Sequence, residues 1–274
     1  MTYLQSIILG IIQGLTEFLP VSSSAHLVLF PYWLGWQIPA TDAFIFNVLV
    51  QLGTLLAVII YFWRDLVNIA RSMINGIIKR QLFKEADARL GWLVILATIP
   101  AGFAGLFLKD TVEAAFSSPI ATALLLLVTA GMLLLAEKAR KAARQSTAPG
   151  WLDAIIIGIF QALSIFPGVS RSGSTITGGL LRGLDRTTAA RFSFLMSIPI
   201  MTAAGGVAFL DMLIIPNLIG FLPVMAAGFI AAAVVGLLSI KWLMGYIRSH
   251  SFLVFAVYCV LVSAFTLVLS FIRG

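Results

Sequence analysis

The sequence has 274 residues, of which 60% are hydrophobic and 11% are charged, whereas soluble domains usually have about 45–50% and about 25%. This composition excludes a soluble globular protein and predicts an integral membrane protein. The formal net charge of +7 does not indicate a nucleic-acid partner, because the basic residues lie between apolar runs, as topology signals do. The single cysteine, Cys259, excludes a disulfide within one chain.

The first apolar run, Tyr3–Thr16, is shorter than the about 20 residues that a membrane-spanning helix needs. Pro20 and the serines after it interrupt the run, and a second short run, Leu27–Trp36, follows. Two half-length helices joined by a polar turn predict a re-entrant hairpin, which a membrane tolerates only where it is buried in protein or lines a cavity. The alternative is one kinked spanning helix from Tyr3 to about Phe30.

Six later runs are long enough to span a membrane, three on each side of a second interrupted segment. They are Phe44–Trp63, Leu90–Leu108, Ile120–Leu135, Ala189–Leu210, Leu218–Ile240 and Phe252–Ile272. The second interrupted segment consists of Ala154–Phe166 and Thr175–Leu181. This order predicts an all-α polytopic membrane protein with six transmembrane helices and two re-entrant helical hairpins in a single membrane domain, residues 1–274.

The two hairpins are similar in sequence. When Gln13 is aligned with Gln161, nine of the nineteen positions of Ile8–His26 are identical to those of Ile156–Ser174, including Gly, Gln, Phe and Ser matches. We therefore predict an internal duplication, with repeats at approximately 1–140 and 150–274. A hairpin does not cross the membrane and three spans cross it an odd number of times, so the second copy is inverted relative to the first.

Basic residues are concentrated on one side of this topology. They follow the first, third and fifth spans and the second hairpin, and they include Arg64, Arg71, Lys79, Arg80, Lys84, Arg89, Lys138, Arg140, Lys141, Arg144, Arg182, Arg186, Arg191, Lys241 and Arg248. By the positive-inside rule this side faces the cytoplasm. Both termini and the mouth of the first hairpin are therefore expected to face the outside.

The first polar segment, Gln13–His26, contains groups that are costly at membrane depth and are therefore functional candidates. Gln13 and Glu17 are four residues apart, so on a helix they share one face. Glu17 is a candidate ligand for a divalent cation or a candidate base, with Gln13 beside it. The alternative is that Glu17 is buried and either protonated or bonded to backbone.

Three serines, Ser22, Ser23 and Ser24, lie at the expected start of the returning helix, where free N–H groups favour an anion. The alternative is that they only cap the helix. His26 lies three residues after Ser23 and four after Ser22, so its imidazole can reach either hydroxyl. This spacing suits a nucleophile and its base, although a lone buried histidine is often just a satisfied core residue.

The second polar segment, Pro167–Thr175, contains Gly168 and Gly173, which permit a tight turn. Its polar side chains are Ser170, Arg171, Ser172, Ser174 and Thr175. The guanidinium of Arg171 matches phosphate oxygens in a bidentate arrangement; the alternative is an intramembrane ion pair with Glu17. We predict that the two polar segments form one phosphate-handling site.

The motifs QGLTEFLPVSSSAH and PGVSRSGST resemble those of the undecaprenyl pyrophosphate phosphatase family of bacteria, also called the bacitracin-resistance protein, and the resemblance covers essentially the whole chain. It implies removal of the terminal phosphate of undecaprenyl diphosphate, at the plasma membrane, with a divalent cation such as Mg²⁺ or Ca²⁺. It also implies an acidic motif at Gln13 and Glu17, a catalytic loop with Ser22, Ser23 and His26, and a phosphate loop with Ser170, Arg171 and Thr175. Many members carry glutamate at the position of Gln13, so metal binding here depends more on Glu17.

The leading hypothesis is an extracytoplasmic phosphatase in which Ser23 attacks the terminal phosphorus, His26 takes its proton, and a cation binds Glu17 and Gln13. Ser22, or water activated by His26, is the alternative nucleophile. The phosphate-binding residues would be Ser22, Ser24, Ser170, Arg171, Ser172, Ser174 and Thr175. The rival function is a transporter or flippase of a lipid phosphate on the same inverted repeat. The expected partners are a polyprenyl diphosphate lipid and the membrane, without nucleic acid, and a homodimer is left open.

Overall fold

The computed structural model describes residues 1–140, 146–212 and 218–273, and this part of the chain forms twelve α-helices. They are α1 (Tyr3–Thr16), α2 (Ser23–Leu34), α3 (Ala40–Tyr61), α4 (Trp63–Ile78), α5 (Ala86–Phe107), α6 (Lys109–Phe116), α7 (Pro119–Arg140), α8 (Trp151–Leu163), α9 (Arg171–Leu181), α10 (Arg186–Met212), α11 (Leu218–Tyr246) and α12 (Leu253–Arg273). The prediction of an all-helical protein is confirmed.

Among the described residues, four helices are long and apolar enough to cross a membrane. They contain the segments Ala86–Phe107, Pro119–Ala139, Gly220–Tyr246 and Leu253–Arg273. In their described part, α3 and α4 pass together as a pair that is bent by 76°. The structure thus has four candidate spans, or five if the bent pair is one span, and a multi-pass membrane protein is the class that it fits.

The other two expected spans, Phe44–Trp63 and Ala189–Leu210, lie largely in α3 and α10 and stay predictions. The residues after Trp63 are not a loop, because α4 begins there and carries Arg64 and Arg71. Its buried residue Ile69 contributes to the main core, against which α5 also packs. The expected span Ala189–Leu210 lies within one helix, α10, which is less apolar than the four candidates and is not among them in its described part.

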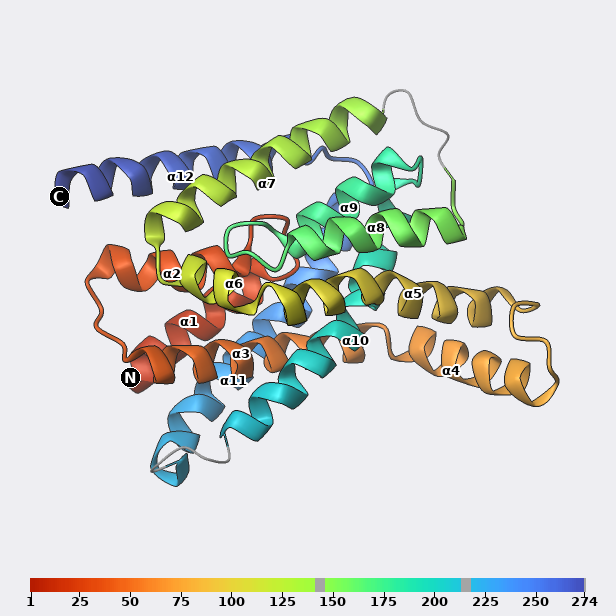
Figure 1. The fold of residues 1–274 in the computed structure, drawn as a ribbon, viewed down its shortest axis with the longest axis horizontal. Helices are drawn as coiled ribbons and strands as arrows, with labels where there is room; N and C mark the ends of the chain where they lie inside the picture. The colour runs from red at the N-terminus through yellow and green to blue at the C-terminus, as the bar shows by residue number, and fades with distance from the viewer. Residues whose placement is uncertain (141–145, 213–217, 274) are drawn as a thin grey trace.

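The hairpins α1–α2 and α8–α9 enter the molecule from opposite ends (Figure 1). The first begins at the end where both termini lie, turns at residues 17–22 in the middle of the molecule and returns to that end. The second begins at the other end and turns at residues 164–170. The two turns meet, because the Ser172 hydroxyl donates to the Leu19 carbonyl at 3.1 Å.

A serine starts each returning helix. Ser22 Oγ accepts the N–H of Ala25 at 3.3 Å, and Ser170 Oγ accepts the N–H of Gly173 at 3.0 Å. Each bond satisfies one of the N–H groups that a helix N-terminus leaves free. Because of the Ser170 cap, α9 begins at Arg171 and not at the predicted Thr175. The prediction that Gly173 forms part of the turn is therefore wrong.

The second turn depends on Gly168, which has a φ of +105°. Residues with a side chain rarely adopt this angle, whereas glycine does so at little cost. A Cβ at this position would also lie 2.7 Å from Leu125 Cβ. Gly168 is thus required both by the backbone angle and by the close approach of α7.

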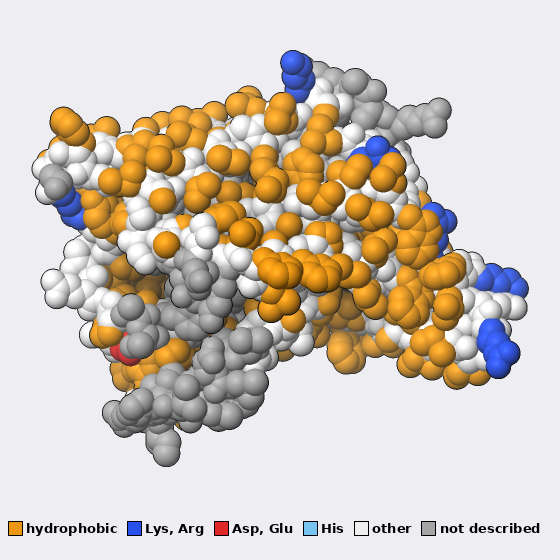
Figure 2. Space-filling model, viewed as in Figure 1, with side chains coloured by type: hydrophobic (Ala, Val, Ile, Leu, Met, Phe, Trp, Pro, Cys, Tyr) orange, Lys and Arg blue, Asp and Glu red, His pale blue; other side chains and the backbone are white. Residues whose placement is uncertain are grey.

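The surface and the core agree with a membrane environment. Figure 2 shows hydrophobic side chains over much of the visible face, with Lys and Arg gathered toward the end where α4 turns into α5 and present also at the upper edge and at the opposite end. A soluble monomer rarely exposes so continuous an apolar surface. Inside, the fully buried ring of Phe18 packs edge-to-face on Phe194, with ring centroids 5.4 Å apart. This contact fixes the turn that contains Glu17.

Candidate functional site

The two polar segments join at the carboxylate of Glu17. Its Oε1 accepts from Arg171 Nη2 at 2.7 Å, and its Oε2 accepts from Ser23 Oγ at 2.5 Å and from Gln13 Nε2 at 2.9 Å. The side chains of Glu17 and Arg171 are only 4% and 12% exposed. The structure therefore brings together Gln13, Glu17, Ser23 and Arg171 in one hydrogen-bonded cluster, which we call the Glu17 cluster.

The sequence had left open whether Arg171 binds an anion or pairs with Glu17, and the structure contains the ion pair. The pair does not use the whole guanidinium. Arg171 Nη1 donates to the Ser193 carbonyl at 3.4 Å, and Nε is buried without a hydrogen-bond partner. A buried donor left unpaired costs about 1–3 kcal/mol. Arg171 therefore has donor capacity left for a further acceptor, and a phosphate oxygen suits its geometry.

The hydroxyl groups predicted to bind phosphate occupy different environments. Ser22 and Ser24 are paired through their Oγ atoms at 3.1 Å, and Ser170 and Ser172 in the same way at 3.2 Å. Thr175 Oγ1 lies 2.6 Å from Ser193 Oγ. These groups surround the meeting point of the two turns.

Ser174 is the predicted phosphate-binding residue that the structure places differently. Its hydroxyl donates to Met132 Sδ on α7 at 3.3 Å, and the structure shows no bond from it to the Glu17 cluster. Ser174 lies on α9, and its hydroxyl is bonded to α7 rather than to the first hairpin. A contact between Ser174 and phosphate stays a prediction of the sequence.

His26 does not form the predicted pair with a serine hydroxyl in this structure. Its Nδ1 is 2.7 Å from the Ser22 carbonyl oxygen, and its Nε2 is 2.7 Å from the Tyr258 hydroxyl. The physical reason is that Ser23 is bonded to Glu17 and Ser22 caps α2. Catalytic hydrogen bonds often tighten only around a bound substrate, so a catalytic role of His26 stays a prediction.

Sequence reasoning missed three polar partners that lie on longer helices. Thr54 on α3 accepts from Gln13 Nε2 at 3.3 Å, Ser193 on α10 contacts Thr175, and Tyr258 on α12 contacts His26. Each is a polar residue inside an apolar run, and that is the only signal by which the sequence could have shown them. Such a signal does not say which partner the residue meets.

The donor atoms at the Glu17 cluster suit a hard divalent cation. Gln13 Oε1 is buried without a hydrogen-bond partner, and the neighbouring ligand atoms are carboxylate and hydroxyl oxygens, the ligands that Mg²⁺ and Ca²⁺ prefer. Among the described residues there is no group of three or more His, Cys, Asp or Glu side chains that could hold a metal. A cation here would therefore have Glu17 as its acidic protein ligand.

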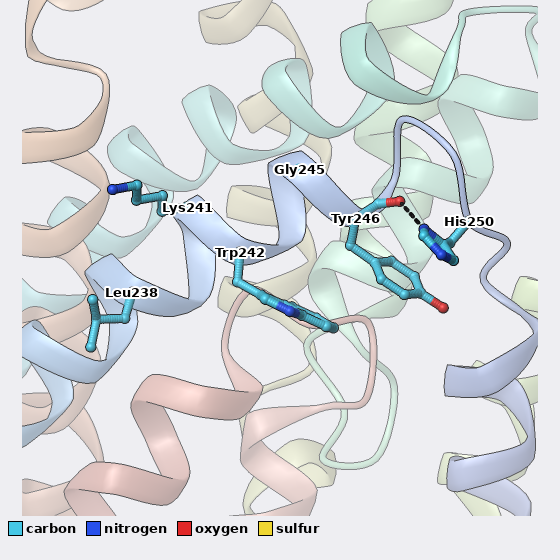
Figure 3. A pocket seen from close by; sticks show the side chains of 6 residues that line it. All are labelled: Leu238, Lys241, Trp242, Gly245, Tyr246 and His250. Carbon is cyan, nitrogen blue, oxygen red and sulfur yellow. Dashed lines mark hydrogen bonds between the residues drawn. The ribbon is translucent and has the colours of Figure 1, made fainter.

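An open hollow on the surface of α11 is separate from the Glu17 cluster (Figure 3). It is lined by Leu238, Lys241, Trp242, Gly245, Tyr246 and His250. The rings of Trp242, Tyr246 and His250 stack in sequence, with centroid distances of 4.9 and 4.5 Å. No residue of the two polar segments lines this hollow. The candidate site is thus a buried polar cluster and is separate from this hollow.

Comparison with known proteins places the chain in a family. The family model described as "Bacitracin resistance protein BacA" matches residues 6–265. Proteins named undecaprenyl-diphosphatase are similar to the chain along its length: one from Moorella thermoacetica is 42% identical over 100% of both chains, and one from Methanosphaera stadtmanae is 41% identical over 97% of this chain and 98% of its own. A third, from Chlorobaculum tepidum, is 43% identical over 94% and 93%. The chain therefore belongs to the BacA family of bacitracin resistance proteins.

Proposed function

We propose that the chain hydrolyses undecaprenyl diphosphate to the monophosphate lipid and inorganic phosphate. Family membership and the names of the relatives support this reaction. The observation that carries it is the Glu17 cluster, in which a hydroxyl, a carboxylate and a guanidinium with an unused donor lie in hydrogen-bond contact. These are the groups that a phosphoryl transfer needs for attack, proton transfer and charge stabilisation.

The terminal phosphate is proposed to bind where the N-termini of α2 and α9 meet. Ser23 is the first residue of α2 and Arg171 is the first residue of α9. A helix N-terminus favours negative charge through its free N–H groups and its dipole. The Arg171 guanidinium adds a full positive charge at the same place. Two helix ends and one arginine thus favour the diphosphate at this point.

Ser23 is the proposed nucleophile, and Glu17 is the base that the geometry favours. Ser23 Oγ forms a bond to the terminal phosphorus, the bond from that phosphorus to the bridging oxygen breaks, and the monophosphate lipid leaves. The proton of Ser23 passes to Glu17 Oε2, which lies 2.5 Å from Ser23 Oγ. The sequence had suggested His26 for this proton transfer, but in the structure the Ser23 hydroxyl is bonded to Glu17 and not to His26.

Water completes the reaction by attack on the seryl phosphate. The Oγ of Ser23 leaves and takes its proton back from Glu17, while inorganic phosphate is released. His26 is the remaining group that can accept a proton from the attacking water. The alternative without a covalent step, in which His26 activates water for direct attack on the diphosphate, uses the same residues.

We infer that Glu17 and Gln13 Oε1 hold a divalent cation, Mg²⁺ or Ca²⁺, together with the substrate. When bound, such a cation neutralises the charge on phosphate oxygens. Mg²⁺ is commonly held by one or two carboxylates and by substrate phosphates, which fits a site with a single acid. The unpaired Gln13 Oε1 is the protein atom that supports this inference.

We further propose six transmembrane helices and two re-entrant hairpins, arranged as an inverted repeat. The aligned residues Gly10 and Gly158 support it, because each lies at a close helix crossing. A Cβ on Gly10 would clash with the Gly228 carbonyl of α11, and one on Gly158 would lie 2.6 Å from the Ala97 carbonyl of α5. The aligned serine pairs of the two turns have equivalent Oγ contacts, at 3.1 and 3.2 Å.

The basic end of the molecule is proposed to face the cytoplasm, so that the first hairpin opens to the extracytoplasmic side. The charge distribution in Figure 2 supports this orientation. Labelling of intact cells with a membrane-impermeant thiol reagent tests it, with single cysteines placed at Thr2 and at Arg80. Reaction at Arg80→Cys without reaction at Thr2→Cys would contradict the orientation.

The direct test of the reaction is phosphate release by the purified protein from a polyprenyl diphosphate in detergent. We expect release by the wild type, none by Ser23→Ala, and acid-stable phosphate on Ser23 in a rapidly quenched reaction. Wild-type protein that binds the lipid but releases no phosphate would contradict the enzyme and favour a transporter. In cells, overproduction of the wild type and not of Ser23→Ala should raise tolerance to bacitracin.

A further inference from the structure

The hydrogen bonds of His26 extend the site to a residue on the last helix. His26 is 1% exposed, and both of its ring nitrogens have a partner. The partner of Nε2 is the hydroxyl of Tyr258 on α12, at 2.7 Å. The two rings lie nearly parallel, with centroids 5.6 Å apart and an interplanar angle of 8°. The Tyr258 side chain therefore fixes both the position and the plane of the imidazole.

These contacts determine which ring nitrogen of the neutral imidazole carries the hydrogen. The Ser22 carbonyl oxygen can only accept, so Nδ1 must be the donor in the 2.7 Å contact. In a neutral imidazole Nε2 then has the lone pair, and Tyr258 must donate its hydroxyl hydrogen to it. The assignment follows from the bonding partners, which is the usual basis for choosing a histidine tautomer.

The same logic limits how His26 can act as a base. Nδ1 already carries a hydrogen, so Nε2 is the nitrogen that can accept a proton, and it does so only when it exchanges the bond from the Tyr258 hydroxyl for one from the attacking water. A base must be held in one orientation to be within reach of the proton that it accepts. In catalytic triads a third group gives the histidine this orientation through a hydrogen bond to the ring. Here the Ser22 carbonyl has that place at Nδ1, and the Tyr258 hydroxyl holds the ring at the other nitrogen, Nε2.

We propose that Tyr258 is a positioning residue for the proposed hydrolysis, because it holds His26 as the Nδ1–H tautomer with Nε2 directed toward α12. The role of Tyr258 in hydrolysis rests on the proposed function, whereas its hydrogen bond to His26 is independent of that function. Tyr258 is 39% exposed, so it forms a link between the buried imidazole and the outer surface of α12. A tyrosine needed only for helix packing would not require a donor aimed at Nε2.

The chain offers a matched control for this contact. Tyr32 lies on α2, as His26 does, and its hydroxyl is 3.0 Å from Ser270 Oγ on α12. Tyr32→Phe therefore removes a hydroxyl contact between the same two helices without changing the partners of His26. Tyr258→Phe removes the hydroxyl and keeps the ring that stacks on His26. Only Tyr258→Phe removes the hydrogen-bond partner of His26 Nε2, whereas Tyr32→Phe leaves it in place.

Kinetics on purified protein test the positioning role. Tyr258→Phe should lower kcat by about 10-fold to 100-fold, less than the about 10²–10⁴-fold that a general acid or base contributes in full. The KM should stay within about twofold of wild type, since the hydrogen bond of the Tyr258 hydroxyl goes to His26 and not to a phosphate-binding residue. Tyr32→Phe should keep wild-type kcat. A kcat of Tyr258→Phe equal to or above wild type would overturn the inference, whereas an inactive wild type would instead overturn the proposed function.

Nitrogen NMR of the imidazole gives a readout that needs no activity. The chain has only two histidines, so a His250→Gln background leaves the signals of His26 alone. The wild-type ring should show a protonated Nδ1 and a hydrogen-bonded, unprotonated Nε2. In Tyr258→Phe the Nε2 signal should move toward that of a nitrogen with a free lone pair, and in Tyr32→Phe it should not move. A wild-type ring with its hydrogen on Nε2 would contradict the proposal even if the variant failed to fold.

Discussion

Replacement of Arg171 by methionine should strongly destabilise the protein, because it leaves the Glu17 carboxylate buried without a counter-charge. Glu17 would keep only the hydroxyl of Ser23 and the amide of Gln13 as partners. Removal of one partner from a buried ion pair typically costs about 3–5 kcal/mol. At about 2–4 °C per kcal/mol for a protein of this size range, the thermal midpoint should fall by roughly 6–20 °C.

A double variant separates the cost of the orphaned charge from the loss of the side chain. In Glu17→Gln/Arg171→Met no buried charge remains, so the double variant should be more stable than Arg171→Met alone. Arg191→Met is the matched control, because its ion pair with Asp65 at 2.5 Å has side chains that are 41% and 35% exposed. Such exposed pairs contribute about 0–1 kcal/mol, so this variant should change the midpoint by only a few degrees.

The assay is thermal unfolding of the detergent-solubilised variants at one protein and detergent concentration. The explanation would be refuted if Arg171→Met unfolded within 2 °C of wild type, or if the double variant were less stable than both single variants. Either result would mean that water reaches Glu17 more freely than its burial indicates. Substrate binding measured on the same samples should be lost in Arg171→Met, because the contact to phosphate acts in the bound state and in the transition state alike.

Three further predictions concern the nucleophile, the cation and the helix crossings. Ser23→Ala should lose nearly all turnover but still bind the lipid diphosphate; a Ser23→Ala rate above a few per cent would move the nucleophile to Ser22 or water. Excess chelator should abolish activity, and Gln13→Glu should lower the Mg²⁺ concentration that gives half-maximal rate; full activity in chelator would contradict a metal. Gly10→Ala should lower the thermal midpoint, because its Cβ meets the backbone of α11, whereas Gly131→Ala, with open space around it, should not; equal midpoints would contradict the close crossing.

The local features of the site were predictable from the sequence where one chain segment determines them. The end of α1 at Thr16 and the start of α2 at Ser23 follow from helix-forming residues, Pro20 and a serine cap. The spacing of Gln13 and Glu17 likewise gave their hydrogen bond at 2.9 Å. In each case the partners are close in sequence, so propensity and spacing are sufficient.

The features that could not be predicted depend on contacts between distant segments. The sequence offered both an anion site and an ion pair for Arg171, and the choice depends on how closely α9 approaches α1. The partner of His26 is 232 positions away on α12. The bend of 76° between α3 and α4 has no proline or glycine at the break and depends on packing. Spacing within one segment carries no information about such contacts.

Ser22 shows why the site is stable only as a whole. Its φ of 66° is unfavourable for a residue with a side chain, and such a conformation costs about 1–3 kcal/mol. Three contacts oppose this cost: its carbonyl holds His26 Nδ1 at 2.7 Å, its hydroxyl caps α2, and the same hydroxyl pairs with Ser24. His26 is held in turn from α12, and the neighbouring Glu17 is held from α9. The strained turn therefore requires helices from later in the chain, so the geometry of the Glu17 cluster should form only late in folding, after α9 and α12 have packed against the first hairpin.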